Sequence, residues 1–343
     1  MPTKDDLKYF QSMPLEIKLA MTRNRIREWV REFGTDGVYV SFSGGKDSTV
    51  LLHIVREMYP DIEAVFVDTG LEYPEIRRFV KTFDNVTILR PKMRFDEVIR
   101  RYGYPMIGKE VALAIWYARK GSIWANNYFD GLDGKGTPHE YKKNMYGKYK
   151  PLCGTDFYIS EKCCRIMKER PIDEYAKATQ KKPITGIMAA ESKKRETAWL
   201  RTGCNSFDSK CQMSKPMSFW TEQDVLQYIK QNGIQIASVY GDIVETGEDG
   251  NEYESNLYGS CGKLHTTGCS RTGCIFCGFG CHLEKEPSRF QRLKETHPRL
   301  YLYCLGGGEY NEDGIWKPNK DGLGMRHVFD ELNRIYGDGF IKY

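Results

Sequence analysis

The sequence predicts an α/β protein built on a doubly wound parallel sheet. Short β-rich runs recur along the chain, and a helical stretch follows each of the first ones. Strands and helices that alternate in this way form parallel sheets through crossover connections. The polar motifs fall where the predicted strands end, and such sheets bind ligands at the carboxyl ends of their strands.

The chain begins with a predicted helical segment, residues 1–34. Ser12 can cap its main helix and Gly34 can end it. Apolar side chains repeat at helical spacing in between, at Ile26, Trp29, Val30 and Phe33.

The predicted strands cover residues 37–42, 63–70, 85–91 and 182–190. Residues 103–152 do not fit the alternation, and their mixture of Gly, Lys and Tyr predicts a lid-like insertion. Thr221 at a cap position predicts a helix over 221–233. The acidic stretch 241–256 predicts an exposed hairpin, and a last helix near 325–336 is expected to bury Val328, Phe329, Leu332 and Ile335.

Composition limits the function classes. The 343 residues carry 51 Lys and Arg against 46 Asp and Glu, and a net charge of +5 neither requires nor excludes nucleic acid. Hydrophobic residues make up 40% and charged residues 28%, which suits a globular enzyme. No apolar run approaches the ~20 residues of a membrane span, and the N-terminus lacks the apolar core of a signal peptide. We therefore expect a cytoplasmic protein without membrane contact.

A glycine turn between the first strand and its helix carries Ser43-Gly44-Gly45-Lys46-Asp47-Ser48. Glycines let successive backbone N–H groups face an anion at a helix N-terminus, and Lys46 adds a positive charge. Ser43 and Ser48 add hydroxyl donors. Because Asp47 follows Lys46, the Walker spacing is absent, so cleavage of a terminal phosphate is not predicted. The alternative is a turn that only joins strand to helix.

These residues resemble the S-G-G-x-D-S signature of the PP-loop ATP pyrophosphatase superfamily. The segment "DTGLEYPE" (68–75) resembles the phosphoadenosine phosphosulfate (PAPS) reductase family. The resemblance implies an adenine nucleotide alpha-hydrolase-like fold that binds ATP or a sulfonucleotide. It further implies that Ser43, Gly44, Gly45 and Ser48 bind the pyrophosphate or its sulfo equivalent, and that Asp68, Thr69 and Gly70 line the adenosine site. By its position alone, Asp68 is equally a helix-capping residue.

Two further segments resemble the same family. In "GIMAAESKKR" (186–195), Glu191, Ser192 and Arg195 match the end of a basic family motif, whereas Met188 and Ala189 replace its basic pair. The segment "KPMSFWTEQDVLQYI" (215–229) resembles a family helix, for which core packing is the simpler interpretation. The resemblance covers about residues 35 to 280 and implies a nucleotide-binding domain over 35–240.

Eleven cysteines are a high and odd number for one chain. In a reducing compartment they predict a metal site better than disulfides. Cys274 and Cys277 have the spacing of a metal clip, and the adjacent Cys163 and Cys164 offer two more thiols. A second four-thiolate set is equally allowed, and thiolates select zinc or iron–sulfur. That set is Cys269, Cys274, Cys277 and Cys281.

Adenylylsulfate reductases, and relatives that place phosphorothioate in DNA, carry a Cys-Cys segment followed by Arg-x-Gly-Cys-x-x-Cys. The segments "EKCCRIMKERP" and "SRTGCIFCG" resemble the two halves, with Arg271 and Gly273 in place. This resemblance implies a [4Fe-4S] cluster completed by a cysteine-rich C-terminal region, residues 241–343; structural zinc is the alternative. Its ligands would be Cys163, Cys164, Cys274 and Cys277.

One departure from the family concerns the nucleophile. Sulfonucleotide reductases carry a cysteine in a C-terminal Glu-Cys-Gly-x-His tail, and this sequence has no such tail. Cys269, Cys281 beside His282, and Cys304 are the candidates to replace it. The alternative for Cys281 is an unreactive, packed thiol.

We therefore expect ATP-dependent adenylation coupled to sulfur transfer. Lys46, Asp47 and Arg195 are the expected catalytic residues, with Asp47 placing Mg²⁺ and Arg195 neutralising phosphate or sulfo charge. The alternatives are a sulfonucleotide reductase that releases sulfite, and a non-catalytic nucleotide sensor. A further alternative is a tRNA- or DNA-modifying enzyme that uses the lysines and tyrosines of 141–150. A sulfur donor or thiol reductant is the expected partner, and the sequence does not determine the oligomeric state.

Overall fold

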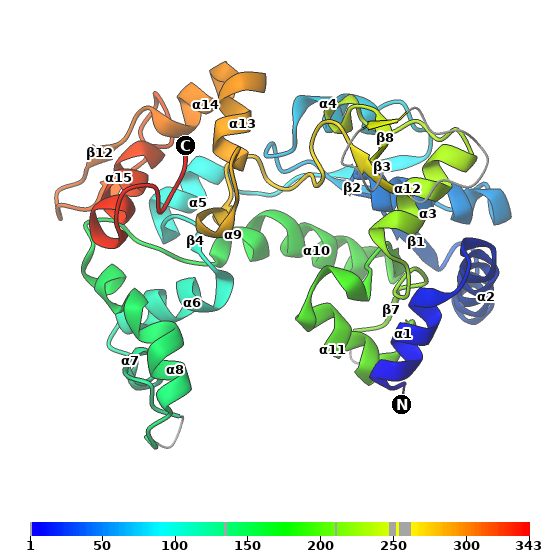
Figure 1. Cartoon of the computed structure of the whole chain (residues 1–343), viewed down its shortest axis with the longest axis horizontal. Coiled ribbons are helices and arrows are strands. Elements are labelled where there is room, and N and C mark those ends of the chain that lie inside the picture. The colour runs from blue at the N-terminus through cyan, green and yellow to red at the C-terminus, as the bar shows by residue number, and fades with distance from the viewer. Residues whose placement is uncertain (1, 134–135, 210, 247–251, 254–261) are drawn as a thin grey trace. The chain divides into compact units, whose positions relative to one another are not determined.

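The structure is a computed structural model that describes residues 2–133, 136–209, 211–246, 252–253 and 262–343. The chain forms two compact units, each assembled from separate segments (Figure 1). Unit 1 comprises residues 1–68, 72–90 and 172–272. Unit 2 comprises residues 69–71, 91–171 and 273–343.

These units do not coincide with the divisions expected near residues 34 and 240. The N-terminal helices belong to unit 1, whereas residues 103–152 belong to unit 2 together with the C-terminal residues. The stretch expected to be a lid-like insertion is therefore part of the framework of a second compact unit.

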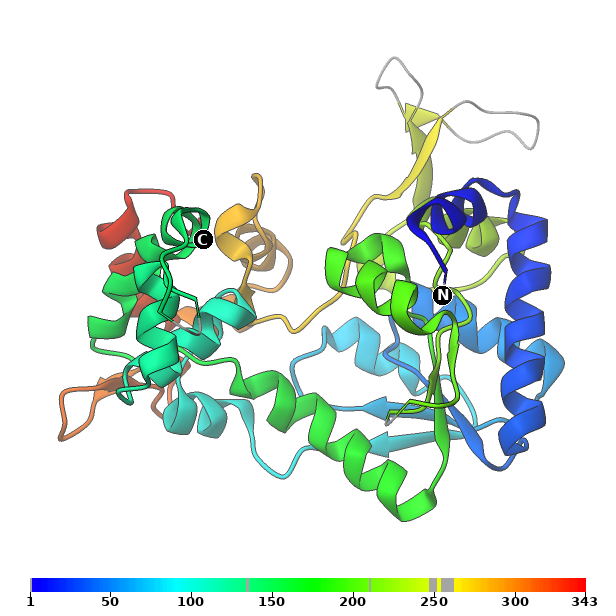
Figure 2. The same ribbon diagram turned by 90° about the horizontal axis from the view of Figure 1, so that it is seen from below.

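Unit 1 is organised around a six-stranded sheet with strand order β3-β2-β1-β5-β7-β6. All neighbouring strands are parallel except β6 and β7. The strands are β1 (Val38–Ser41), β2 (Ala64–Val67), β3 (Val86–Leu89), β5 (Lys182–Thr185), β6 (Asn205–Ser206) and β7 (Met213–Ser214). The first of them lie side by side as blue to cyan arrows in Figure 2. The doubly wound parallel sheet is thus confirmed, and all four predicted strands are present.

Helices connect and cover this sheet. They are α1 (Lys4–Ser12), α2 (Leu15–Phe33), α3 (Lys46–Met58), α4 (Pro74–Val80), α10 (Arg170–Thr179, in unit 1 from residue 172), α11 (Lys193–Thr202) and α12 (Glu222–Gln231). Helix α3 packs against α2 and α12. A buried ion pair joins α2 to α12, because Lys18 Nζ donates to both carboxylate oxygens of Asp224 at 2.8 and 2.7 Å.

The N-terminal segment contains two helices where one was expected. Ser12 ends α1 and does not cap α2, which begins after Pro14. Thr3 caps α1 through a reciprocal capping box with Asp6. Gly34 ends α2 as predicted, with a positive φ of 76°.

The helix predicted over 221–233 is confirmed as α12, whose Thr221 cap pairs with Asp224. The expected acidic hairpin is seen in β8 (Ile243–Thr246) and β9 (Glu252–Tyr253), and β10 (Lys263–Thr266) pairs on the other side of β8. Glu245 is not exposed as expected: it is 4% exposed and accepts a hydrogen bond from Gly262 N. Residues 247–251 and 254–256 of this stretch lie outside the described residues, as does Cys261.

Unit 2 is mainly helical. Its helices are α5 (Phe95–Tyr102), α6 (Lys109–Ala118), α7 (Ile123–Asp130), α8 (Glu140–Tyr146), α9 (Lys162–Cys164), α13 (Arg289–Thr296), α14 (Pro298–Leu305) and α15 (Met325–Tyr336). Short strands complete it: β4 (Met106–Ile107) pairs with β11 (Gly278–Phe279), and β12 (Glu309–Tyr310) with β13 (Trp316–Lys317).

The core of unit 2 includes one face of α15. Val328, Phe329 and Leu332 are buried as predicted, whereas Ile335 is only half-buried. His327 Nε2 lies 2.9 Å from Asp156 Oδ2, which also accepts a hydrogen bond from the Tyr310 hydroxyl. Among the described residues of the whole chain, no helix has the length and apolar character needed to cross a bilayer.

Candidate functional site

The serine–glycine loop follows β1 directly and leads into α3. Gly45 is the N-cap of α3 and has no side chain with which to cap the helix; the Tyr240 hydroxyl accepts the first helical amide, that of Lys46, at 3.1 Å. The N-terminus of α3 keeps the partial positive charge that favours an anion.

The two serines close the loop. Their hydroxyl oxygens lie 3.0 Å apart, and the Ser48 hydroxyl also donates to Gly45 O at 2.9 Å. Gly44 has a φ of +71°, and a Cβ there would lie 2.7 Å from Val80 and 2.8 Å from Ile76. Only glycine fits this position without strain.

Lys46 is 2% exposed, although its side chain is charged. Its ammonium group donates to Ser270 O at 2.9 Å and lies 3.1 Å from Glu222 Oε1. The carboxylate of Asp47 is 3.6 Å away. Protein groups thus compensate the buried charge and fix the lysine at the start of α3.

Burial raises the pKa of Asp47, and the nearby Lys46 opposes this shift. Asp47 Oδ1 is buried and has no hydrogen-bond partner within the described part of the chain. Gly186, which follows β5, packs against the backbone here, since a Cβ on it would lie 3.2 Å from Asp47 O. The loop thus lies between the ends of β1 and β5, where the strand order reverses and such sheets bind ligands.

The segment 186–195 contributes a carboxylate, that of Glu191, which two arginines share. Ser192 caps α11 by accepting a hydrogen bond from Arg195 N at 3.3 Å. Glu191 forms an ion pair with Arg195 and lies 3.9 Å from Arg271. Burial and the neighbouring Arg271 guanidinium lower the pKa of Arg195. The structure therefore brings Arg271 to this motif, whereas the sequence assigned it only to the cysteine segment.

The segment 68–75 is divided between the units. Asp68 belongs to unit 1, where the Arg77 side chain binds it at 3.0 Å and Arg90 lies 3.8 Å away. Asp68 does not cap the following helix, because Tyr73 is the N-cap of α4. Thr69 and Gly70 belong to unit 2.

The four predicted metal ligands all belong to unit 2. A hydrogen bond from Cys163 lowers the pKa of Cys164 to about 6, and Lys109 and Lys168 add to the effect. The same hydrogen bond, together with burial, raises the pKa of Cys163, and the thiols of Cys274 and Cys277 raise it further. The four thiols are therefore close enough to influence one another. Four thiols near cationic side chains are a donor set that suits iron–sulfur or zinc.

Within the described ranges, no three or more His, Cys, Asp or Glu side chains are arranged as a ready metal site. The alternative thiol quartet draws on both units, since Cys269 belongs to unit 1 and Cys274, Cys277 and Cys281 to unit 2. The set that includes Cys163 and Cys164 lies within one unit.

The candidate replacement nucleophiles in unit 2 are buried. Cys281 is 2% exposed, donates to Gly278 O, and has a pKa raised to about 12 by burial. Cys304 is fully buried, which raises its pKa as well. Burial also lowers the pKa of His282, so this imidazole is not the cation that would activate Cys281. Neither thiol has the environment of a reactive cysteine.

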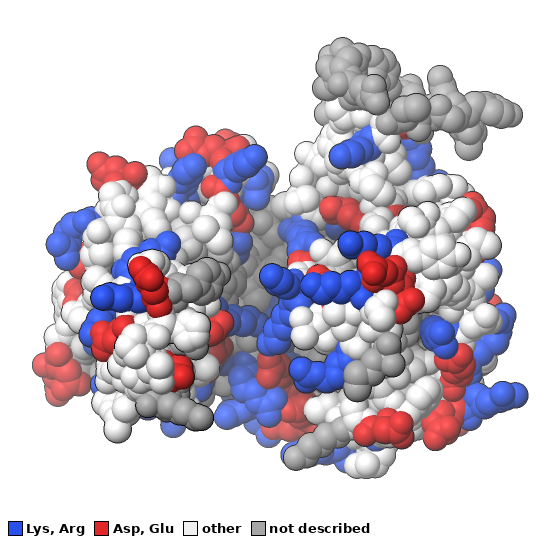
Figure 3. All heavy atoms as spheres, turned by 60° about the horizontal axis from the view of Figure 1, so that its bottom comes forward, with Lys and Arg blue, Asp and Glu red and all other residues white. Residues whose placement is uncertain are grey.

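The tyrosines of the 141–150 segment pack against other side chains where the structure describes them. Tyr149 is 7% exposed, and Tyr146 stacks on Tyr128 with ring centres 4.4 Å apart. On the face shown in Figure 3, basic and acidic side chains are interspersed on both parts of the chain. These features do not add support for the nucleic-acid hypothesis.

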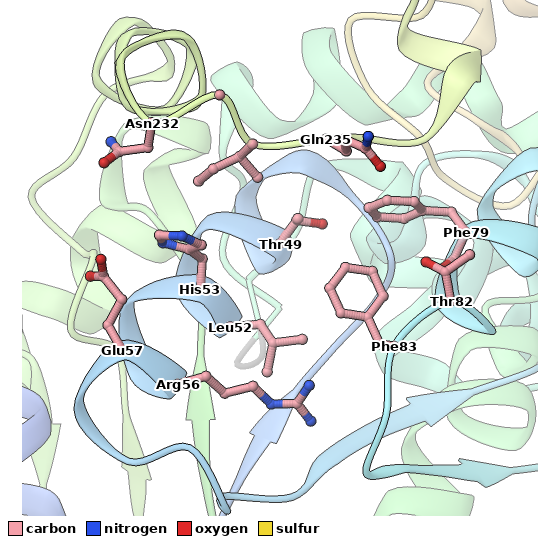
Figure 4. Close-up of a pocket in the computed structure, with 12 residues that line it drawn as sticks. Thr49, Leu52, His53, Arg56, Glu57, Phe79, Thr82, Phe83, Asn232 and Gln235 are labelled. Carbon is pink, nitrogen blue, oxygen red and sulfur yellow. The ribbon is translucent and has the colours of Figure 1, made fainter.

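A cavity of about 580 Å³ lies along α3, and no predicted site residue lines it (Figure 4). Leu52, Phe79 and Phe83 form its apolar part, and His53 and Arg56 are among its polar lining. Arg56 donates to the carbonyls of residues 84 and 85, so its guanidinium joins α3 to the segment that precedes β3.

Comparisons with known proteins show the family of the chain. The family model described as "Phosphoadenosine phosphosulfate reductase domain" matches residues 37–106 and 136–278. A phosphoadenosine 5'-phosphosulfate reductase of Xylella fastidiosa (strain M23) is 25% identical over 267 residues, covering 78% of this chain and 86% of that relative. An uncharacterized protein of Methanocaldococcus jannaschii is 23% identical over 293 residues, covering 82% of this chain and 51% of its own.

Among solved structures, the phosphate complex of a PAPS reductase from Candida auris gives a TM-score of 0.38 at 13% identity, covering 75% of this chain and 98% of that one. The family model matches more than half of the chain and includes the loop, the segment 68–75 and the cysteine segments. This chain therefore belongs to the PAPS reductase family of the PP-loop superfamily.

Proposed function

We propose that this chain is an enzyme that binds an adenine nucleotide at Ser43–Ser48 and acts on the bond between its α-phosphorus and the leaving group. The observation that carries the proposal is the start of α3 at the sheet's switch point, where the N-cap is a glycine and where Lys46 lies together with two serine hydroxyls. The names of the curated relatives support sulfur chemistry on an adenine nucleotide.

In this proposal the reaction is ATP-dependent adenylation coupled to sulfur transfer. An acceptor nucleophile attacks the α-phosphorus of ATP and pyrophosphate leaves; a sulfur nucleophile from a donor then displaces AMP. Three observations favour ATP: Asp47 offers a carboxylate for Mg²⁺, Met188 and Ala189 replace a basic pair, and the cysteines near the C-terminus are buried.

The loop residues would share the charge of the leaving group. The hydroxyls of Ser43 and Ser48 and the amides of Gly44 and Gly45 would donate to pyrophosphate, and Lys46 would neutralise it. Arg195 would stabilise charge at the α-phosphate. Asp68, with Thr69 and Gly70, is proposed to contact the adenosine.

Cys163, Cys164, Cys274 and Cys277 are proposed to hold a [4Fe-4S] cluster, with structural zinc as the alternative. A cluster would supply electron transfer or an electrostatic contribution, whereas zinc would only stabilise the fold. The cationic side chains of Lys109 and Lys168 near Cys164 favour the thiolate form that either group requires.

A sulfonucleotide reductase is the second candidate, and the names of the Xylella relatives favour it. In that reaction a thiolate would attack the sulfur of PAPS or adenylylsulfate, the nucleotide would leave, and a thiol reductant would then release sulfite. The burial of Cys281 and Cys304 does not favour either of them as this thiolate.

Calorimetric titration of anaerobically purified protein with Mg-ATP, adenylylsulfate and PAPS tests the proposal. Binding of ATP in preference to both sulfonucleotides, with pyrophosphate released when an acceptor nucleophile is supplied and AMP released when a sulfur donor is added, would support adenylation. Preference for a sulfonucleotide with sulfite release would support the reductase. Binding without turnover of any of the three would contradict both and leave a nucleotide sensor.

A further inference from the structure

A second segment of unit 1, residues 266–272, lies against the loop although it is more than two hundred residues away in sequence. Backbone hydrogen bonds fix it to residues 239–242: Thr267 N donates to Asp242 O, Gly268 N to Tyr240 O, and Cys269 N to Val239 O. Ser270 O then accepts from Lys46 Nζ at 2.9 Å. Residues 266–272 and Tyr240 thus pack beside the loop, and we call them together the second wall of the site.

Two hydroxyl groups of this wall reach the start of α3. Tyr240 is 2% exposed, and its hydroxyl accepts the Lys46 backbone N–H at 3.1 Å and lies 2.7 Å from Thr272 Oγ1. A Cβ placed on Gly45 would lie 3.2 Å from the Tyr240 hydroxyl and 3.4 Å from Thr272 Oγ1. Both hydroxyls therefore border the backbone that would bind phosphate.

The proton count of this pair leaves one donor unused. Tyr240 and Thr272 carry one hydroxyl proton each, and only one of them can lie in the hydrogen bond between the two oxygens. The Lys46 amide uses a lone pair of Tyr240 and no proton. Burial raises the pKa of Tyr240 to about 12, so its hydroxyl stays protonated at neutral pH.

Arg271 adds a cation next to this pair. Glu191 is shared between Arg195 and Arg271, so one carboxylate faces two guanidinium groups. The Arg271 side chain is 60% exposed and makes a long contact of 3.9 Å to Glu191, which leaves its donors available to another anion.

We propose that Tyr240, Thr272 and Arg271 are further phosphate-binding residues, which contact the anion from the side opposite the serine–glycine loop. The inference rests on the proposed nucleotide site and deepens it. The hydroxyl pair donates its spare proton to a phosphate or sulfo oxygen. Arg271, whose positive charge Glu191 only partly offsets, neutralises negative charge on the same anion.

Inorganic pyrophosphate and Mg-ATP are the probes, each titrated by calorimetry into wild type and the variants Tyr240→Phe, Thr272→Val and Arg271→Gln. Loss of a hydrogen bond to a charged group corresponds to about 1.5–3 kcal/mol, so we expect Tyr240→Phe and Arg271→Gln each to raise the Kd roughly tenfold or more. Thr272→Val should act in the same direction as Tyr240→Phe.

Matched controls come from the same unit. Tyr39→Phe removes the hydroxyl of another buried tyrosine, and Arg27→Gln removes an exposed arginine on α2; both should leave the Kd within twofold of wild type. Thermal unfolding monitored by circular dichroism verifies that each variant is folded before titration.

The outcomes separate the two proposals. If the wild type binds none of the nucleotides and no pyrophosphate, the proposed function fails together with this inference. If the wild type binds but Tyr240→Phe and Arg271→Gln bind equally well, only the inference is overturned. Tighter binding by Tyr240→Phe would also overturn it, since the hydroxyl would then merely compete with phosphate for the Lys46 amide.

Discussion

The loop of unit 1 and the cysteine group of unit 2 are organised in different ways. The loop is one contiguous motif whose lysine already has protein partners, because the Lys46 ammonium contacts Ser270 O and Glu222. The cysteines come from two distant segments, and the thiols of Cys163 and Cys277 have raised pKa values. Internal bonds thus stabilise the loop, whereas the proposed cysteine site would gain its stability from a bound metal.

Replacement of a cysteine ligand should have the largest effect. Cys274→Ala is expected to abolish the iron content and visible absorbance of anaerobically purified protein, because a thiolate ligand is lost. It should also lower the thermal stability, since metal binding adds to folding free energy. Metal analysis and absorption spectra measure this.

Cys211→Ala is the control for this experiment, because Cys211 is an exposed thiol of unit 1. Equal iron in both variants would contradict the proposed ligand set. If the wild type contains zinc and no iron, the proposed ligand set stands but the proposed [4Fe-4S] cluster is wrong.

Breaking the buried ion pair of unit 1 should have the next largest effect. Lys18→Met leaves the Asp224 carboxylate buried without its cation, which should reduce the free energy of unfolding by about 3 kcal/mol. Urea unfolding provides the measurement. Arg23→Met on the same helix breaks a more exposed pair with Glu57 and should change stability by less than about 1 kcal/mol. Equal effects of the two substitutions would mean that the buried pair contributes no more than a surface pair.

Removing the loop lysine should weaken nucleotide binding with a smaller change in energy. Lys46→Ala deletes a charge-assisted interaction of about 1.5–3 kcal/mol, so the Kd for Mg-ATP should rise roughly ten- to hundredfold. Lys230→Ala, at an exposed position on α12, should leave the Kd unchanged. An unchanged Kd in Lys46→Ala would contradict the assignment of the loop to the nucleotide-binding site.

The smallest expected effect concerns pH. Burial raises the pKa of Asp47, so the folded state binds its proton more tightly than the unfolded state does. Its contribution to stability is therefore lost as pH rises from the ordinary value near 3.8 through the raised one. Asp47→Asn should stabilise the protein by up to about 1 kcal/mol at neutral pH, with no gain in acid.

Thermal unfolding of Asp47→Asn between pH 4 and 8 measures this, with the exposed Asp36→Asn as control. A loss of stability at neutral pH would mean that the attraction between Asp47 and Lys46 exceeds the effect of burial.

The sequence predicts local features of this protein better than long-range ones. The strands and the loop depend on contiguous residues, and the structure has β1 and α3 where the pattern indicates them. Pairing over long distances leaves little trace in one sequence. Nothing in the local pattern indicates that Tyr240 reaches the Lys46 amide, or that Arg271 shares Glu191 with Arg195.

The division into units shows the same limit. Composition favoured a lid at 103–152, because glycine, lysine and tyrosine are common in surface segments. In the structure Ile115 and Leu152 are fully buried, so this stretch helps to build a core. The position of Arg271 beside the cysteine clip marks it as a basic residue of interest. The sequence does not indicate its pairing, however, because Glu191 and Arg195 lie in the distant segment 186–195.

The interleaved segments of unit 1 have a consequence for its synthesis on the ribosome. β1, β2 and β3 emerge early, but β5, which pairs with β1, follows only after residues 91–171, which belong to unit 2. One side of β1 consequently stays unpaired while the intervening residues are translated, and an unpaired strand edge invites wrong partners. Nascent chains stalled before residue 182 should therefore engage chaperones more than chains released after residue 272.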